Sequence, residues 1–245
     1  MSAGTALPVR HVIDGQTVEL PVRVRSARSA TATFLVPAPA ARAWLPDPAL
    51  QLVTPIPGRA VLSIAAVDYI DNDLGDYNEL AIGLFVRPAS VSNGSAVRDL
   101  LRGRPAIHVR WMPVDQPFTR EAGERIWGFP KTVDEIPLTV EDGLLEASWI
   151  KDGQTVLDLR MPARGGKSLP PADTQSFTMM NGRLHRVPFR MAPTDARVSS
   201  GRRVRVRLGD HPLAEELRAL GMPRRALMAM WMGNLEATFM PAEPA

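Results

Sequence analysis

The chain of 245 residues has 45% hydrophobic and 22% charged residues, proportions that exclude a disordered, collagen-like or membrane-spanning protein. Its 29 Lys and Arg exceed its 26 Asp and Glu by three, and only Lys131, Lys151 and Lys167 are lysines. So small an excess, carried almost wholly by arginine, does not indicate a nucleic-acid-binding protein. The absence of cysteine excludes disulfides, thiolate catalysis and Cys-ligated metal sites.

The start of the chain has no basic segment followed by an apolar run, and no later stretch reaches the roughly 18 apolar residues of a membrane span. We therefore expect a cytoplasmic protein with no membrane partner. No break in composition, long polar linker or internal repeat divides the chain, which predicts a single domain over residues 1–245.

Short apolar or alternating runs, separated by frequent prolines, predict a mainly β protein. The expected strands are, in chain order, 17–24, 31–36, 60–67, 80–86, 106–112, 136–140, 144–149, 155–161, 177–180, 204–208 and 235–239. Helical patterns are few, at 40–45, 96–102, 119–126, 213–220 and 224–232. Most connections are too short for parallel crossovers, so we expect an antiparallel barrel or sandwich with a few helices outside.

Three local patterns do not support a specific site. Gly166-Lys167-Ser168 lacks the first glycine of a phosphate-binding loop, and the acidic run 71–79 has glycine one position too early for a calcium loop, so both read better as turns. Arg203, Arg205 and Arg207 alternate with apolar residues, which favours a solvated outer face over an anion-binding surface. The histidines have no paired metal spacing, so we expect no metal site.

The segment Trp127-Gly128-Phe129-Pro130-Lys131 is chemically distinctive. Two aromatics, a flexible glycine and a proline set a bend from which one of the chain's three lysines emerges. Burial against aromatics would lower the pKa of its amine from about 10.4 towards 7, as a carbonyl-attacking lysine requires. The alternative is a solvated lysine that follows a proline.

A carboxylate candidate, Glu79, follows the turn Gly75-Asp76-Tyr77-Asn78 at the start of an apolar strand. A buried carboxyl group there could shuttle protons to and from an enamine. The alternative is an exposed residue at the start of a strand.

The segment 124–131 (ERIWGFPK), preceded by Gly123, resembles the aromatic-Pro-Lys active-site segment of the acetoacetate decarboxylase superfamily. Residues 74–79 (LGDYNE) are similar to the family's Gly-x-Tyr-x-Glu turn, and 211–213 (HPL) has a counterpart near the C-terminus. The likeness runs from about Phe34 to Phe239. It implies a closed antiparallel β-barrel-like fold and a homo-oligomer.

The resemblance also implies roles for individual residues. Lys131 matches the Schiff-base lysine and Glu79 a proton-transfer glutamate, while Tyr77, Trp127 and Phe129 would line the substrate pocket. Arg28, with Arg25 as the second choice, would bind a substrate carboxylate.

The chain departs from the founding decarboxylase at two places. Thr132 stands where that enzyme has a second lysine, and a second glutamate, which would fall near Ser63 or Ile64, is absent. Similar departures occur in relatives that condense pyruvate with an aldehyde.

Two functions remain open. The first is a lyase in which Lys131 forms a Schiff base with a small keto acid, followed by decarboxylation or by addition to an aldehyde co-substrate and loss of water; it needs no cofactor. The second is a non-catalytic or cyclase-like barrel of secondary metabolism that holds an apolar, polyketide-like ligand. A nucleic-acid partner has little support.

Overall fold

The computed structural model describes residues 9–102 and 104–245, which are folded mainly as strands. The strands are β1 (Val9–Ile13), β2 (Gln16–Leu20), β3 (Val22–Pro37), β4 (Leu50–Leu52), β5 (Arg59–Asn72), β6 (Tyr77–Pro88), β7 (Ala106–Val114), β8 (Lys131–Val133), β9 (Leu138–Glu141), β10 (Leu144–Lys151), β11 (Gln154–Pro162), β12 (Ala172–Met180), β13 (Arg183–Ser200), β14 (Arg205–Leu208), β15 (Met228–Phe239) and β16 (Glu243–Pro244). The helices are α1 (Ala38–Ala41), α2 (Asn93–Leu101), α3 (Pro117–Trp127), α4 (Pro212–Ala219) and two short 3-10 turns, η1 (Arg42–Trp44) and η2 (Gly201–Arg203).

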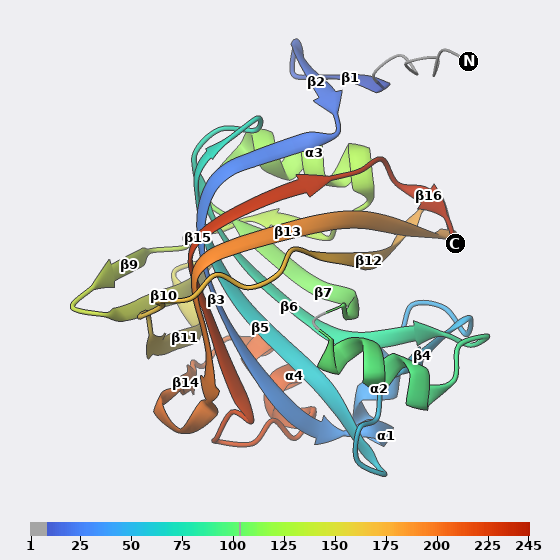
Figure 1. Cartoon of the computed structure of the whole chain (residues 1–245), viewed down its shortest axis with the longest axis vertical. Coiled ribbons are helices and arrows are strands. Elements are labelled where there is room, and N and C mark those ends of the chain that lie inside the picture. The colour runs from blue at the N-terminus through green and yellow to red at the C-terminus, as the bar shows by residue number, and fades with distance from the viewer. Residues whose placement is uncertain (1–8, 103) are drawn as a thin grey trace.

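The largest sheet curls into a barrel-like ring (Figure 1). Its strands pair in the order β6–β5–β3–β15–β13–β12–β7, and β6 also pairs with β7, which joins the two ends of this path. The mainly β, barrel-like architecture is therefore confirmed. The expectation of an entirely antiparallel ring is wrong at one place, because β12 runs parallel to β7. The long stretch of chain between these two strands permits this crossover.

The main hydrophobic core lies outside the ring. On β5 and β6 the fully buried Ile64 and Leu80 cluster with Trp149 and Leu157 of a second sheet, ordered β14–β11–β10–β9. Successive side chains of a strand point to opposite faces. The intervening Ser63, Ala65, Glu79 and Ala81 therefore point into the ring, and its interior is left available for a cavity.

Helices cover the two ends of the ring (Figure 1). At one end α3 and the β1–β2 hairpin bury Ile13, Leu20 and Ile126 in one cluster. At the other end α2 packs Ala96 against Phe85, close to β4. The site described below lies at the α3 end.

Two sequence-based expectations differ from the structure. Residues 224–232 do not form a helix, because β15 begins at Met228 and pairs with both β3 and β13. Its Ala and Met residues favour helices, but pairing with two strands overrides that preference. The longest strand, β13, was not predicted, because its sequence is rich in polar residues, contains Pro188 and Pro193 and shows no clear alternation.

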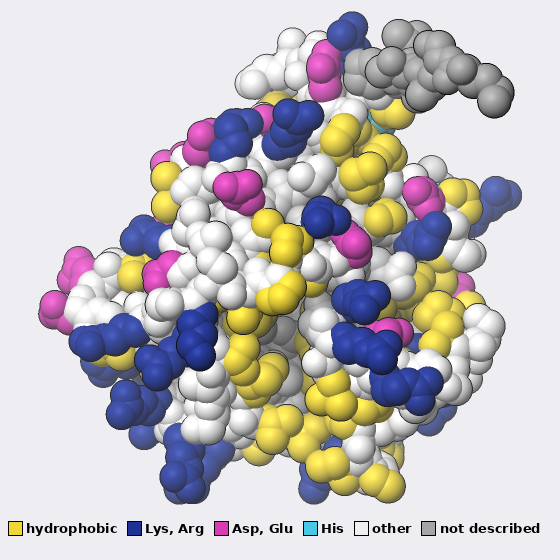
Figure 2. Space-filling view, in the orientation of Figure 1, with side chains coloured by type: hydrophobic (Ala, Val, Ile, Leu, Met, Phe, Trp, Pro, Cys, Tyr) yellow, Lys and Arg dark blue, Asp and Glu magenta, His cyan; other side chains and the backbone are white. Residues whose placement is uncertain are grey.

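The arginine stripe lies where the solvated-face interpretation places it. Arg205 and Arg207 are exposed on β14, the edge strand of the second sheet, and Arg207 pairs with Asp158, whereas Arg203 belongs to the η2 turn. Figure 2 shows the face of the molecule that is turned to the viewer in Figure 1. Cationic side chains are spread over this face, and hydrophobic side chains gather around a hollow in its middle. No helix within residues 9–102 and 104–245 is long and apolar enough to cross a membrane.

Candidate active site

The bend before Lys131 is formed by the end of α3. Gly128 adopts a left-handed conformation (φ 67°), and its N–H donates to the carbonyl of Glu124 while the N–H of Phe129 donates to Gly123. This arrangement ends the helix in a usual way. Pro130 then prevents the helix from continuing, and Lys131 opens β8, which runs parallel to β7.

Glu79 and Lys131 meet inside the protein. Glu79 lies near the start of β6, opposite Val114 of β7, while Met112 of the same strand faces Lys131. Because β7 lies between β6 and β8, the two charged side chains converge, and Lys131 Nζ is 2.8 Å from Glu79 Oε2. Their side chains are only 4% and 6% exposed. The carboxylate and the amine, which lie 52 positions apart in the sequence, therefore form a buried ion pair.

Two hydroxyl-bearing side chains complete the surroundings of the amine. Lys131 Nζ donates to Thr119 Oγ1 of α3 at 3.3 Å and lies 4.9 Å from the ring centre of Tyr77. Tyr77 stacks on Tyr69, its partner across the β5–β6 pair, with ring centres 4.5 Å apart. Both contacts stabilise a buried ammonium, because an aromatic face attracts a cation and a hydroxyl oxygen accepts a hydrogen bond from it.

These neighbours set the protonation states. Burial by itself would lower the pKa of Lys131, but the negative charge of Glu79, helped by Tyr77, outweighs it and raises the pKa above its ordinary value. Burial raises the pKa of Tyr77, and raises that of Tyr69 well above its ordinary value, so both phenols stay protonated. The expectation of a lowered lysine pKa is therefore wrong for the free protein, because it left out a carboxylate in contact with the amine.

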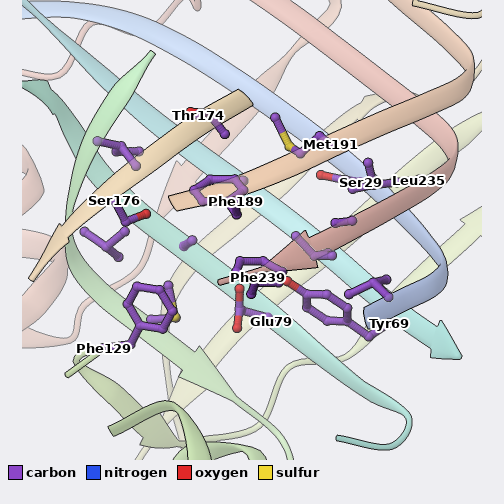
Figure 3. Close-up of a pocket in the computed structure, with 18 of the residues that line it drawn as sticks. Ser29, Tyr69, Glu79, Phe129, Thr174, Ser176, Phe189, Met191, Leu235 and Phe239 are labelled. Carbon is purple, nitrogen blue, oxygen red and sulfur yellow. The ribbon is translucent and has the colours of Figure 1, made fainter. Parts of the chain in front are cut away.

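The pair faces a cavity of about 210 Å³ within the ring. Figure 3 shows Ser29, Glu79, Phe129, Met191 and Phe239 among the side chains that line it. The remaining lining is mostly apolar: Val22, Val24, Val67, Leu74, Phe85, Ile107, Val109, Met112, Phe189, Met230, Met232 and Leu235 are among its members. A mostly apolar wall lowers the local dielectric constant and so strengthens the electrostatic contacts beside it.

The predicted pocket residues Tyr77, Trp127 and Phe129 are all brought to this cavity. Trp127 and Phe129 are 3% and 5% exposed and have ring centres 5.8 Å apart. The indole N–H of Trp127 donates to the carbonyl of Met240 at 2.9 Å, which fixes its orientation. These aromatics form part of the dry wall around Lys131.

The structure does not bring Arg28 to the cavity. Its neighbour Ser29 points inward, so Arg28 occupies the opposite face of β3 and donates to Asp68 on β5. The second choice, Arg25, is also outside, where it pairs with Asp71 and Asp73. Its hydrogen bond lowers the pKa of Asp71. The predicted carboxylate-binding role of Arg28 is therefore wrong, because its side chain lies on the face of β3 that points away from the cavity.

Thr119 was not predicted to take part in the site, and Gly123 was named only as part of the family resemblance, with no role of its own. They lie four residues apart on one face of α3, and both contact Lys131. A Cβ added at Gly123 would lie 2.6 Å from Cδ of Lys131, so the lysine side chain would have to move if any other residue stood there. Their spacing could have identified them once Lys131 was placed against this helix.

The remaining sequence motifs have structural roles. Asn72 in the acidic run accepts from the N–H of Leu74 and donates to the carbonyl of Gly75, as expected of a turn. His211 caps α4 by accepting from the N–H of Leu213. Among the residues that the structure describes, no group of three or more His, Cys, Asp or Glu side chains could hold a metal ion.

Replacement of Gly123 by alanine tests the position of the lysine. We expect G123A to reduce reaction of Lys131 with a small aldehyde plus cyanoborohydride by at least about tenfold, because the new methyl group pushes the amine away from Glu79. The adduct is measured by peptide mass spectrometry. Alanine otherwise stabilises a helix by roughly 0.5–1 kcal/mol relative to glycine, so the protein should stay folded. G94A, in α2 with open space around the added Cβ, is the matched control.

Replacement of Glu79 by glutamine tests what sets the lysine pKa. The carboxylate raises this pKa, so E79Q removes that effect and leaves burial to lower it. Because only the unprotonated amine reacts, the midpoint of Lys131 labelling against pH should move to lower pH in E79Q. E124Q, at an exposed glutamate of α3, should leave the midpoint unchanged. An unchanged midpoint in E79Q would show that the pair does not control the amine.

Comparison with known proteins identifies the family and the fold. The family model described as acetoacetate decarboxylase (ADC) matches residues 6–240. An acetoacetate decarboxylase structure from Legionella pneumophila superposes with a TM-score of 0.63 at 17% identity, covering 92% of this chain and 87% of that one. No curated protein matches the chain.

Two further structures share the fold. The enduracididine biosynthesis enzyme MppR, complexed with the condensation product of pyruvate and imidazole 4-carboxaldehyde, has a TM-score of 0.62 at 18% identity and covers 99% of this chain and 98% of its own. An acetoacetate decarboxylase-like enzyme from Sphingomonas wittichii RW1 has a TM-score of 0.56 at 15% identity, with coverage of 94% and 96%. By its family match over nearly its whole length, and in keeping with its barrel-like fold, this chain belongs to the acetoacetate decarboxylase family.

Proposed function

We propose that this protein is a Schiff-base-forming carbon–carbon lyase in which Lys131 is the nucleophile and Glu79 transfers protons. The observation that carries this proposal is the 2.8 Å contact between the amine and a carboxylate, both buried beside an apolar cavity. A buried lysine with a base in contact is the arrangement that attack on a carbonyl requires.

The first step needs a neutral amine, and Glu79 can produce it by taking a proton from Lys131. The ammonium of Lys131 gives one proton to the carboxylate, and the lone pair on Nζ then attacks the carbonyl carbon of the substrate. The carbonyl oxygen takes up the proton from Glu79 and a second proton from the nitrogen and leaves as water. The sum is ammonium plus carbonyl giving a protonated imine plus water, with Glu79 returned to its carboxylate form.

The protonated imine then accepts electrons from a neighbouring bond. If carbon dioxide leaves from a carboxylate on the next carbon, or an aldehyde leaves while Glu79 takes the proton of its hydroxyl group, the bonding pair moves into the imine and forms an enamine. If a proton leaves instead, Glu79 receives it, and the enamine can add to an aldehyde and later lose water. Tyr77 and Thr119 keep the amine in position, while Trp127 and Phe129 keep water away.

The comparisons support a small keto acid as substrate and an aldehyde as co-substrate, since the MppR structures contain pyruvate or a product of pyruvate and an aldehyde. Pyruvate and acetoacetate are therefore the first compounds to test. We propose also a single domain over 1–245 and a cytoplasmic location, as the sequence pattern predicts, and a homo-oligomeric state, as the family resemblance implies.

The second candidate is a binding barrel without catalysis. Two features favour it. The cavity has a mostly apolar lining, and the chain lacks the second lysine and second glutamate of the founding decarboxylase, with Thr132 at the lysine position and Ser63 or Ile64 near the glutamate position. An intact lysine–carboxylate pair is not needed merely to hold an apolar ligand, and burying it costs free energy. We therefore favour the enzyme.

Borohydride trapping distinguishes the two candidates. We expect incubation with a panel of pyruvate, acetoacetate and acetone, followed by reduction, to add the mass of at least one reduced compound to the protein. The adduct should map to Lys131 and be absent in K131M, in which methionine fills a similar volume without an amine. K167A, at a lysine outside the cavity, should keep the adduct.

A second experiment tests Glu79 separately. It omits the reductant and measures how fast the protein exchanges, for deuterium, the α-protons of the compound that forms the adduct. We expect this exchange to fall at least about a hundredfold in E79Q, within the range that one general base usually contributes. Ligand binding without adduct in the unaltered protein would favour the binding barrel instead.

A further inference from the structure

The cavity contains balanced charge and no spare cation. Among its described lining residues only Lys131 and Glu79 are charged, and each neutralises the other. Arg120 and Arg125 border a separate depression that Lys131 also touches, but there they pair with Glu121, and Arg120 also pairs with Glu124. No described side chain of the cavity is therefore available to pair with a substrate carboxylate.

Formation of the Schiff base does not change this balance. The protonated imine keeps the single positive charge of the lysine, and Glu79 still neutralises it. A keto acid would add a second carboxylate to an apolar space that has no further partner for it, and a buried charge without a partner is strongly disfavoured. An uncharged ketone or aldehyde leaves the cavity neutral at every stage.

The shape of the cavity points to a substrate longer than pyruvate or acetoacetate. Glu79 and Phe85 on β6 both line it, and six residues of strand span about 20 Å. Phe85 and Ile107 pair across β6 and β7. Phe189 and Met191 of β13 add to this apolar wall, whose polar members include Ser29, Thr31, Ser63, Thr174 and Ser176. Aromatic and methionine side chains of this kind adapt to flexible apolar chains.

We propose that the substrate is an uncharged carbonyl compound with an extended apolar chain, whose carbonyl carbon meets Lys131 and whose chain lies along the wall formed by Phe85, Ile107, Phe189 and Met191. The covalent part of this inference rests on the proposed function, whereas the charge and length of the ligand depart from the small keto acid that the comparisons support and rest on the cavity alone. The carbon–carbon bond that is broken or formed then lies next to the imine, and the chain provides binding energy away from it.

The test compares two ligands with the same reactive end: methyl hexyl ketone, and the same ketone with a carboxylate at the far end of its chain. We expect half-maximal trapping on Lys131 at a concentration at least about tenfold lower for the uncharged ketone, because only the acid buries an unpaired charge. Binding of both compounds to K131M is measured by calorimetry, which reports affinity without covalent chemistry.

A variant tests where the chain lies. I107W narrows the part of the cavity away from the lysine and should weaken trapping of methyl hexyl ketone at least about tenfold while acetone is trapped as before. R190A is the matched control, because Arg190 is exposed on β13 and lies between the inward-pointing Phe189 and Met191.

The outcomes separate the two proposals. Equal or tighter trapping of the acid would overturn the uncharged substrate class and leave the Schiff-base function standing. Binding of methyl hexyl ketone to both the unaltered protein and K131M, with no adduct from any compound, would support the ligand class and overturn the proposed function. Absence of both binding and trapping of methyl hexyl ketone would overturn the ligand class.

Discussion

The contact between Lys131 and Glu79 is the constraint around which the site is arranged. At 2.8 Å, two unit charges attract by about 6 kcal/mol at an effective dielectric constant of about 20, and the cost of removing each from water is several kcal/mol. The pair therefore gives little net stability. Either charge alone would be unfavourable in this apolar space, so removal of one partner favours the neutral form of the other.

Pairing provides a reactive lysine without a lowered pKa. In a site that shifts the amine pKa to near neutrality, the proton leaves for solvent before substrate arrives. Here the proton remains shared between two buried groups, and transfer across one hydrogen bond replaces two buried charges with two neutral groups. Burial favours that neutral state, because it disfavours charged forms of both partners. The proton transfer leaves the net charge unchanged, and the apolar cavity therefore lowers the free-energy cost of making the amine neutral.

The architecture explains how a cavity can exist inside a stable protein. One face of β5 and β6 carries large apolar side chains such as Ile64 and Leu80. This face packs outward against the second sheet. The interior is lined partly by small residues such as Ser63 and Ala65, which leave space unfilled. Stability thus comes from the core outside the ring, and the interior is free to serve binding.

The sequence predicted the parts of this arrangement that depend on local pattern. Alternating runs identified most of the ring, and the aromatic-Pro-Lys segment and the tyrosine turn identified Lys131 and Glu79. What depends on long-range pairing was missed: β13 lacks an apolar alternation, and the face occupied by Arg28 is set by a bulged pairing of β3. Thr119 and Gly123 matter only through their contact with a lysine on another element.

A single carboxylate also limits the chemistry. With Ser63 in the cavity and Thr132 exposed, Glu79 is the only acidic side chain among the described lining residues. The same group must take the ammonium proton, deliver it to the departing oxygen and then remove or return a proton at the neighbouring carbon. Removal of a proton is compatible with the earlier tasks, because imine formation returns Glu79 to its carboxylate form; return of a proton first requires Glu79 to take one up from water. The carbonyl oxygen and the reacting carbon must therefore both lie within reach of Glu79, which fixes the orientation of the substrate beside Lys131.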